Sequence, residues 1–322
     1  PALNPVRASV ALRGRVTVRN RPDTNQNLGC RDRGDVWWMR IHFVHLAQCV
    51  VSLCRRRFWW PGWVLFLSGC ALGPSLPDDA RLLSDVSYAE RATGRLTGRL
   101  FLPAAQGPSP AVLLLHGGGW RNGSPQQMDL IARRLVSEGF VVFSAAYRLA
   151  PGTRYPGQLE DVRAAFSWLA DRPEVDPERM AAWGYSAGAQ LALLLGLNPA
   201  PGQTRPRAVV AGGAPVALAL FDGESRLLVN YLGAPRSEAP GTWSDASPVE
   251  WVSQDDPPAY LYHGQTDRLV DIRHARLLAR RLREAGVEVA LDEVAGGHVG
   301  VFLTGRAIEA RATAFLTERL GG

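Results

Sequence analysis

The stretch "RMAAWGYSAGAQLALLLGL", residues 179–197, joins a strand-like segment to a helix-like one through a serine with a glycine on each side. Residues 179–186 are typical of a buried strand, and residues 189–197 of a buried helix. Between them Ser186 stands in a G-x-S-x-G pattern, where larger side chains would clash as the strand folds back into the helix. The stretch therefore predicts a sharp strand–turn–helix unit around Ser186. Because a glycine-rich chain also forms this pattern by chance, the neighbouring motifs decide its meaning.

From residue 80 the chain alternates strand-like and helix-like segments, which predicts an α/β fold with a mostly parallel central sheet flanked by helices. Residues 216–257 break this alternation before the penultimate strand and are rich in Pro, Gly and Trp. Long connections of this kind are usually functional in compact domains. The expected strands are residues 94–103, 111–116, 140–147, 179–186, 207–215, 258–264 and 287–294, and the expected helices are 124–139, 155–173, 189–197, 270–286 and about 301–320.

A second motif, "HGGGW" at residues 116–120, directly follows the buried strand expected at 111–116. Its glycines allow backbone N–H groups to approach a substrate oxygen closely, as an oxyanion loop requires. A glycine-rich turn without any chemical role is the alternative interpretation. The position of the motif, upstream of Ser186 and after a strand, favours the oxyanion loop.

Asp267 and His298 follow the last two expected strands by three and four residues. The chain order Ser, Asp, His is the order of an α/β-hydrolase triad. The rival acids Asp255, Asp256 and Asp271 precede the strand or lie within a helix. Among the histidines, only His298 is expected in a flexible loop at the carboxyl end of a strand, where a general base can reach the serine. A single histidine in a loop would more often face solvent. Here the chain order of Ser186, Asp267 and His298 favours a catalytic role for His298 instead. The expected places of the other five are the leader for His42 and His45, the start of the glycine loop for His116, a strand end for His263 and a helix for His274.

Residues from about 80 to 320 resemble the α/β-hydrolase superfamily, in particular its esterase and lipase branch related to hormone-sensitive lipase and to bacterial feruloyl and acetyl esterases. The stretches that carry the resemblance are "HGGGWRNGS", "YRLAP", "YPGQLEDVRAAFSWL", "GYSAGAQLAL", "PPAYLYHGQTDRLV" and "GGHVG". One departure is "GGHVG", where many relatives have a second glycine straight after the histidine. In this light, residues 216–257 correspond to the variable segment that shapes the acyl or alcohol pocket.

The resemblance implies a serine carboxylesterase that acts on small or carbohydrate-linked acyl esters, without a metal or an organic cofactor. It implies Ser186 as nucleophile, His298 as base and Asp267 as the acid that orients the base. The expected oxyanion donors are the backbone N–H groups of Gly118, Gly119 and Ala187. Position also predicts that Trp120, Arg121 and Tyr185 border the substrate pocket, with a packing role as the alternative for Trp120.

Two other functions are consistent with parts of this pattern. A peptidase or amidase shares the triad but usually carries a large extra domain near its N-terminus, and residues 1–79 are short and irregular. A catalytically inactive hydrolase fold could serve as a binding module. Such modules typically lose the serine, the histidine or the glycine loop, and this chain has all three.

The net charge of +6 does not indicate a nucleic-acid partner, because it is unevenly placed. Residues 1–69 carry eleven Arg against three acidic groups, a balance of +8, whereas from Cys70 onward 25 Arg face 27 acids, a balance of −2. A basic leader does not make a basic binding face. No cysteine follows Cys70, so the later chain can hold neither a disulfide nor a cysteine metal site.

Residues 55–69 resemble a bacterial lipoprotein signal, with three arginines, an apolar run of about ten residues and the sequence "LSGC" ending at Cys70. The resemblance implies a lipid on Cys70, a tether at 70–79, a hydrolase domain at 80–322 and a place in the bacterial envelope. Ala71 after the cysteine favours the outer membrane. The alternatives are a buried strand at 55–69, and with it a cytoplasmic protein, or a short signal anchor at 41–54. Residues 1–54 stay unassigned.

Overall fold

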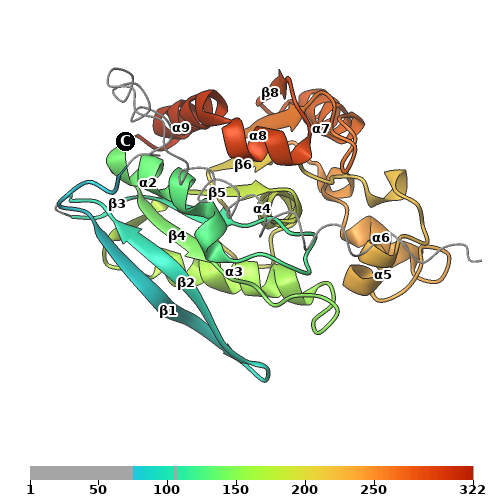
Figure 1. Cartoon of the computed structure of the whole chain (residues 1–322), viewed down its shortest axis with the longest axis horizontal. Coiled ribbons are helices and arrows are strands. Elements are labelled where there is room, and N and C mark those ends of the chain that lie inside the picture. The colour runs from blue at the N-terminus through green and yellow to red at the C-terminus, as the bar shows by residue number, and fades with distance from the viewer. Residues whose placement is uncertain (1–74, 105–106, 322) are drawn as a thin grey trace, which may run out of the picture. The chain divides into compact units, whose positions relative to one another are not determined.

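The computed structural model describes residues 75–104 and 107–321, so the predicted leader, signal and lipid site at Cys70 lie outside the described residues. The described chain forms an eight-stranded sheet in the order β1-β2-β4-β3-β5-β6-β7-β8 (Figure 1). β2 runs antiparallel to β1 and β4, and all other neighbours are parallel. The strands are β1 (Arg81–Arg91), β2 (Gly94–Leu102), β3 (Ser109–Leu115), β4 (Val141–Ala145), β5 (Val175–Tyr185), β6 (Ala208–Gly212), β7 (Ala259–Gly264) and β8 (Val289–Val294).

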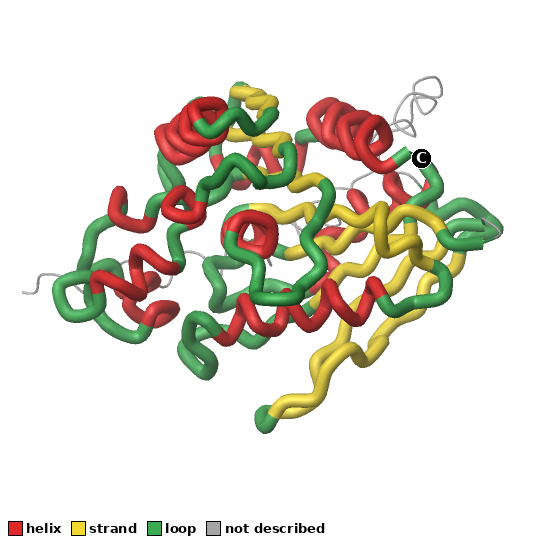
Figure 2. Tube along the Cα trace, turned by 180° about the vertical axis from the view of Figure 1, so that it is seen from behind, coloured by secondary structure: helices red, strands yellow, loops and turns green. Residues whose placement is uncertain are grey.

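Helices cover both faces of the sheet, as Figure 2 shows from behind. Side chains of β3 alternate between two apolar clusters because successive residues of a strand point to opposite faces. Leu113 joins α3 (Gly157–Ala170), α4 (Ala187–Leu197) and α7 (Arg273–Glu284) on one face. Val112 and Leu114 join α2 (Asp129–Ser137) and α9 (Arg306–Leu320) on the other. This burial on both faces explains the continuous apolar run of β3.

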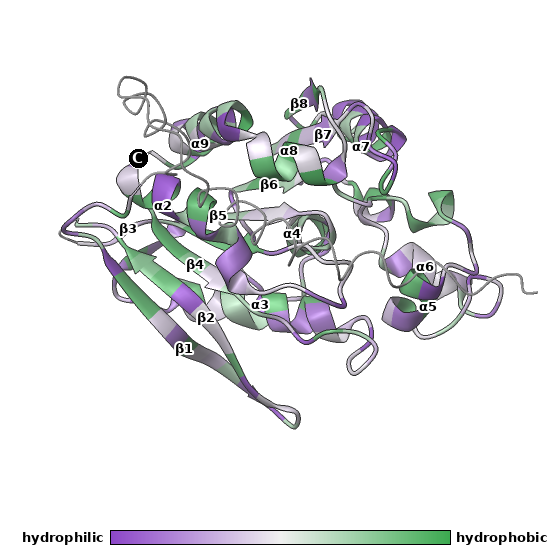
Figure 3. Ribbon diagram, in the orientation of Figure 1, coloured by the Kyte–Doolittle hydropathy of each residue, from purple (hydrophilic) through white to green (hydrophobic). Residues whose placement is uncertain are grey.

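The outer helices α2 and α7 are amphipathic, whereas α4 is apolar on all sides apart from Gln190. Figure 3 shows hydrophilic and hydrophobic residues mixed along α7 and α9. Every residue of α4 is buried, so the segment that follows Ser186 lies in the core. No helix among the described residues is both long and apolar enough to span a bilayer.

Three element predictions need correction. β1 was not predicted, because this edge strand buries only Tyr88 and has no regular apolar alternation. The helix predicted at 124–139 begins as a 3₁₀ turn, η2 (Pro125–Met128), before α2. The helix predicted at 301–320 is two helices, α8 (His298–Thr304) and α9, separated at Gly305. A Cβ atom at Gly305 would lie 2.5 Å from the carbonyl oxygen of Val301, so the chain bends where only glycine fits.

Residues 216–257 form four short helices rather than an irregular loop. They are η3 (Leu218–Leu220), α5 (Arg226–Leu232), α6 (Pro240–Asp245) and η4 (Pro248–Trp251). We call residues 216–257 the cap. Ser247 links the start of the cap to α6, because its hydroxyl accepts from the N–H of Leu218 at 2.9 Å and donates to the carbonyl of Trp243 at 2.7 Å.

Candidate active site

Ser186 occupies a strained backbone conformation between β5 and α4. Its φ of 54° and ψ of −120° are rare for a residue with a side chain. A Cβ atom at Gly184 would lie 2.2 Å from the carbonyl oxygen of Gly188, and one at Gly188 would lie 2.2 Å from that of Leu115. The predicted need for glycine on both sides of the serine therefore has a measurable cause.

Three side chains from three strand ends line up in hydrogen-bonding distance. Ser186 Oγ lies 2.8 Å from His298 Nε2, and His298 Nδ1 lies 2.6 Å from Asp267 Oδ2. Because a carboxylate only accepts, Nδ1 donates to it, which leaves Nε2 free to accept the serine proton. The structure thus brings together the three residues that the sequence selected.

His298 differs from the prediction in one respect. It is the first residue of α8 and does not lie in a flexible loop. The segment leading to it passes close to β7, where a Cβ atom at Gly264 would lie 2.5 Å from the carbonyl oxygen of Gly296. The N–H of Thr266 donates to the same carbonyl at 3.1 Å. The imidazole is therefore placed by an ordered chain.

The carboxylate of Asp267 is buried and held by several donors. Its Oδ1 accepts from the backbone N–H groups of Leu269 and Val270, each at 2.9 Å. Its Oδ2 faces His298 and lies 3.3 Å from Nε2 of His263. Burial raises the pKa of Asp267, but the hydrogen bonds from His263, His298 and Val270 outweigh burial and hold this pKa well below its usual range. Asp267 is consequently ionised throughout the neutral range.

The glycine loop lies beside Ser186 and has unpaired donors. A Cβ atom at Gly117 would lie 3.3 Å from Cβ of Ser186. Gly118 and Gly119 have φ angles of 117° and 61°, which glycine adopts without strain. Within the part of the chain that the structure describes, the N–H groups of Gly118, Gly119 and Ala187 donate to no other group. These are the three donors predicted from sequence.

His116 and Tyr147 pack against each other and hold the backbone at the start of the glycine loop. This role was not predicted from the sequence. The two rings stack with centroids 4.3 Å apart, and the Tyr147 hydroxyl donates to the carbonyl of His116 at 2.8 Å. Nδ1 of His116 donates to the carbonyl of Gly117 at 2.8 Å. Burial lowers the pKa of His116 to about 4, so the ring is neutral at pH 7. The stretch "YRLAP" holds Tyr147, but nothing in it indicates this contact.

Two of the three predicted pocket residues are packing residues. Trp120 is 2% exposed, stacks on Tyr231 of the cap with centroids 4.1 Å apart and donates its N–H to Gln190 at 3.0 Å. Tyr185 is buried and donates its hydroxyl to the carbonyl of His298 at 2.5 Å, so it supports the histidine from behind. Arg121 is exposed. Trp120 thus takes the packing role that the sequence left open.

Leu227 of α5 is a pocket candidate that the sequence did not identify. Its Cδ atoms lie 3.2 and 3.4 Å from the position of a Cβ atom at Gly119, yet 41% of the residue is exposed. The side chain therefore lies over the glycine loop with one face open to solvent. Only the unusual length of residues 216–257 pointed toward this segment.

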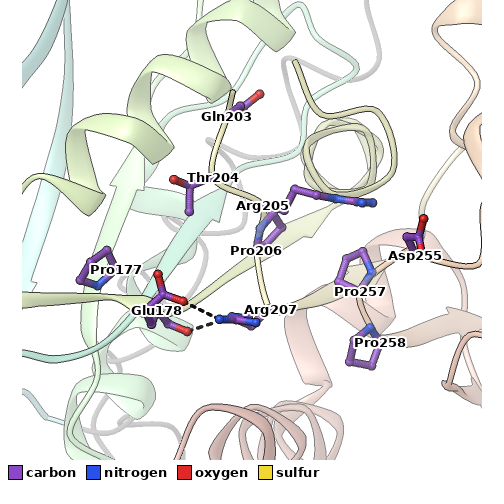
Figure 4. Close-up of a pocket in the computed structure, with 10 residues that line it drawn as sticks. All are labelled: Pro177, Glu178, Gln203, Thr204, Arg205, Pro206, Arg207, Asp255, Pro257 and Pro258. Carbon is purple, nitrogen blue, oxygen red and sulfur yellow. Dashed lines mark hydrogen bonds and ion pairs between the residues drawn. The ribbon is translucent and has the colours of Figure 1, made fainter. Parts of the chain in front are cut away.

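A hollow of about 570 Å³ lies at the amino-terminal ends of the central strands, whereas Ser186 lies at their carboxyl ends (Figure 4). It is lined by the amino-terminal part of β5 and the loops before β6 and β7, where exposed Glu178 and Arg207 form an ion pair. Glu178 and Ser186 are eight residues apart on one strand and its turn, which corresponds to about 25 Å. This hollow is separate from the serine. Among the residues that the structure describes, no three His, Cys, Asp or Glu side chains form a candidate metal site.

The sheet order, the strained serine turn and the positions of Asp267 and His298 after β7 and β8 define an α/β-hydrolase fold. Comparison with family models agrees, because the BD-FAE model matches residues 99–282, more than half of the chain. The chain belongs to the BD-FAE family.

Individual relatives place it among proteins named as hydrolases. Esterase LipC of Mycobacterium tuberculosis is 30% identical over 55% of this chain and 49% of its own length. The uncharacterized peptidase YtmA of Bacillus subtilis is 27% identical over 59% of this chain and 76% of its own. A truncated carbohydrate esterase from gut microbiota has a similar structure, with a TM-score of 0.68 and 23% identity over 78% of this chain and all of its own. The chain spans about half the length of the first curated relatives it matches.

Proposed function

We propose that the protein is a serine carboxylesterase that hydrolyses small or carbohydrate-linked acyl esters. The observation that carries this proposal is the alignment of Ser186, His298 and Asp267 beside three backbone N–H groups that have no acceptor among the described residues. Membership in the BD-FAE family and the similarity to Esterase LipC support it. The name of the carbohydrate esterase with a similar structure supports the carbohydrate-linked class.

In the first half of the reaction, Ser186 Oγ attacks the ester carbonyl carbon while Nε2 of His298 takes the hydroxyl proton. The ionised Asp267 holds Nδ1–H and stabilises the imidazolium that forms. The carbonyl oxygen gains negative charge, and the N–H groups of Gly118, Gly119 and Ala187 donate to it. Each such donor contributes about 10² to 10³ in rate in comparable sites.

The imidazolium then returns its proton to the alcohol oxygen, so the C–O bond breaks and the alcohol leaves. A water molecule replaces the alcohol and gives its proton to His298 as it attacks the acyl-enzyme carbonyl. The proton then passes to Ser186 Oγ, and the acid is released. The short link from Ser186 to His298 allows each transfer without movement of the backbone.

Hydrolysis of p-nitrophenyl acetate by the wild type and by Ser186→Ala tests the nucleophile. We expect kcat to fall by about six orders of magnitude, toward the rate without nucleophile, with the melting temperature changed by only a few degrees. Labelling of the wild type by a fluorophosphonate, followed by peptide mapping, should place the adduct on Ser186. Retention of wild-type turnover by the variant would show that another residue is the nucleophile.

A peptidase is the second candidate, because one relative of the chain is named a peptidase. Amides share the acyl-transfer chemistry, so a direct comparison of matched ester and peptide substrates separates the two functions. We expect kcat/KM for the ester to exceed that for the amide by orders of magnitude. Faster hydrolysis of the peptide would favour the peptidase, and no labelling by the fluorophosphonate would favour a binding module.

We also propose that Cys70 carries a lipid that anchors the enzyme in a bacterial envelope, on the basis of the lipobox-like sequence "LSGC" before it. The prediction concerns residues outside the described ones. Expression of full-length Cys70→Ala should move the enzyme from the membrane fraction to the soluble fraction with its activity intact. A variant that stays with the membrane fraction would contradict the anchor.

A further inference from the structure

His263 is a buried histidine that the proposed reaction does not use. It lies in β7 with no exposed surface, four residues before Asp267. Its Nε2 is 2.7 Å from the carbonyl oxygen of Val270 and 3.3 Å from Oδ2 of Asp267. The ring therefore contacts Oδ2, the carboxylate oxygen to which the backbone N–H groups do not donate.

The surroundings of His263 decide which ring nitrogen carries the proton. A carbonyl oxygen only accepts, so Nε2 must be the donor in the 2.7 Å contact with Val270, and Oδ2 of Asp267 is a second acceptor within reach at 3.3 Å. Nδ1 is buried and has no hydrogen-bond partner among the described residues. A proton there would be a buried donor without an acceptor, which is costly. The geometry thus places the ring proton on Nε2.

The donors to Asp267 are divided unequally between its two oxygens. Two backbone N–H groups fix Oδ1, whereas within the described part of the chain Oδ2 meets only the side chains of His298 and His263. Without His263, Oδ2 would be held by His298 alone, and that imidazole must itself stay aligned with Ser186. The two backbone donors on Oδ1 would still hold the carboxylate, but its tilt at Oδ2 would be less tightly set, and the hydrogen bond to His298 would be less well aligned.

We propose that His263 is a positioning residue of the triad: its Nε2–H is shared between the carbonyl of Val270 and Oδ2 of Asp267, and this shared hydrogen bond holds the carboxylate in the plane that His298 needs. The proposal rests on the proposed function, since it assigns His263 a role in that site. His263 touches no reacting atom. It acts through Asp267 and His298, by preorganising their hydrogen bond.

The tautomer of His263 is tested on the wild-type protein, independently of turnover. In protein labelled with ¹⁵N-histidine, two-bond ¹H–¹⁵N spectra should show His263 protonated on Nε2 only, with a slowly exchanging proton. The His263→Gln spectrum provides the assignment. Protonation on Nδ1 would overturn the proposal, whether or not the protein hydrolyses esters.

The kinetic test uses His263→Leu and His263→Gln, because the Gln amide can place an N–H near the position of Nε2. We expect kcat for p-nitrophenyl acetate to fall about 10- to 100-fold in His263→Leu with KM nearly unchanged, and Gln to restore most of this loss. The low-field proton signal of His298 Nδ1–H should move or broaden in the Leu variant and return in the Gln variant. Equal losses in the two variants, or an unmoved signal in His263→Leu, would contradict positioning.

His274→Leu is the matched control. His274 is also a buried histidine, and its Nδ1 accepts from the N–H groups of Val216 and Ala217 at 3.2 and 3.3 Å, with no hydrogen bond to the triad among the described residues. Its loss should lower stability and leave the low-field signal of His298 in place. The same change of signal in both Leu variants would mean that general loosening, rather than the bond to Asp267, causes the effect. If the wild type itself hydrolyses no ester, the proposed function fails. The tautomer of His263 and the low-field signal of His298 would still test the contact between His263 and Asp267.

Discussion

The serine turn at residues 184–188 and the cap at residues 216–257 border the same site, but different contacts hold them. The turn depends on close approaches between backbone atoms, such as the 2.2 Å that would separate a Cβ atom at Gly188 from the carbonyl of Leu115. Backbone atoms of a buried strand cannot move away cheaply. The turn therefore accepts no larger residue at this point.

The cap is held by side chains instead. Tyr231 stacks on Trp120, the hydroxyl of Tyr155 donates to Oδ2 of Asp245 at 2.6 Å, and Gln190 donates to the carbonyl of Ala246 at 2.6 Å. Side-chain contacts can be exchanged for others of similar volume. The comparison shows that different contacts hold the nucleophile Ser186 and the cap that borders the proposed substrate pocket. Substitutions in the cap can therefore change substrate specificity while the geometry of the serine turn stays the same.

Gly188→Ala should have the largest effect, because the new Cβ atom meets backbone oxygens of both Leu115 and His116 at 2.2 to 2.4 Å. We expect a loss of unfolding free energy of about 4 kcal/mol or more, with activity lost over 1,000-fold. Urea denaturation and ester hydrolysis measure both. Gly241→Ala in α6 is the control, since nothing lies within 4 Å of its new Cβ atom, and it should be neutral or slightly stabilising. Similar behaviour of the two variants would remove the distinction between turn and cap.

Tyr231→Ala should have the second-largest effect, because it removes a fully buried ring from the contact between the cap and Trp120. We expect a loss of about 3 to 5 kcal/mol in unfolding free energy and a raised KM, with the rate of fluorophosphonate labelling less affected. Tyr231→Phe keeps the ring and loses only the 3.3 Å hydrogen bond to Gln190, so it should cost about 1 kcal/mol. If labelling fell as far as kcat/KM, the cap would be part of the catalytic machinery rather than a wall.

The fold and the triad could be predicted because they rest on patterns local in the chain. Buried parallel strands give continuous apolar runs, and the serine turn and the glycine loop require glycine at fixed positions. Asp267 and His298 could be selected because parallel strands bring their carboxyl ends to one edge of the sheet. Each of these inferences needs only a few neighbouring residues.

The contacts around the triad could not be predicted in the same way. His263 and Asp267 are neighbours in sequence, yet the bond between them depends on how the chain turns after β7. Trp120 meets Tyr231 across more than 100 residues, and no periodicity encodes that pairing. The sequence therefore named Trp120 and Tyr185 as pocket residues from proximity alone, whereas the cap and α8 bury them.

Lowering the pH should destabilise the folded protein through two buried histidines, one beside the serine turn and one beside the cap. Burial lowers the pKa of His116, under the glycine loop, and of His274, which accepts from the first residues of the cap, to about 4. Between pH 6.5 and about 4 these histidines therefore bind protons in the unfolded chain but not in the folded chain. The unfolding free energy consequently decreases as the pH is lowered through this range. Burial raises the pKa of Asp256 and Glu309, which offsets part of this loss.

We expect each of the two histidines to lower the unfolding free energy by about 2 kcal/mol from pH 7 to pH 4.5, before the carboxyl groups offset part of this loss. Urea denaturation at several pH values measures the slope. His274→Asn keeps an acceptor for the cap and removes one titrating group, so its slope should be smaller than that of the wild type. An identical slope would show that His274 does not contribute.

The smallest effect is expected for Leu227→Ala, and it bears most directly on substrate choice. Leu227 is 41% exposed, so its loss should cost about 1 kcal/mol or less in unfolding free energy. Its Cδ atoms lie over Gly119, beside the proposed oxyanion donors, and removing them opens space where an ester would lie. The ratio of kcat/KM for p-nitrophenyl hexanoate to that for the acetate should rise several-fold, because extra methylenes then find room. Leu220→Ala, at an equally exposed position in η3, is the control and should leave the ratio unchanged. If both variants change it alike, the cap acts through its overall packing, and Leu227 is not the residue that limits the acyl chain.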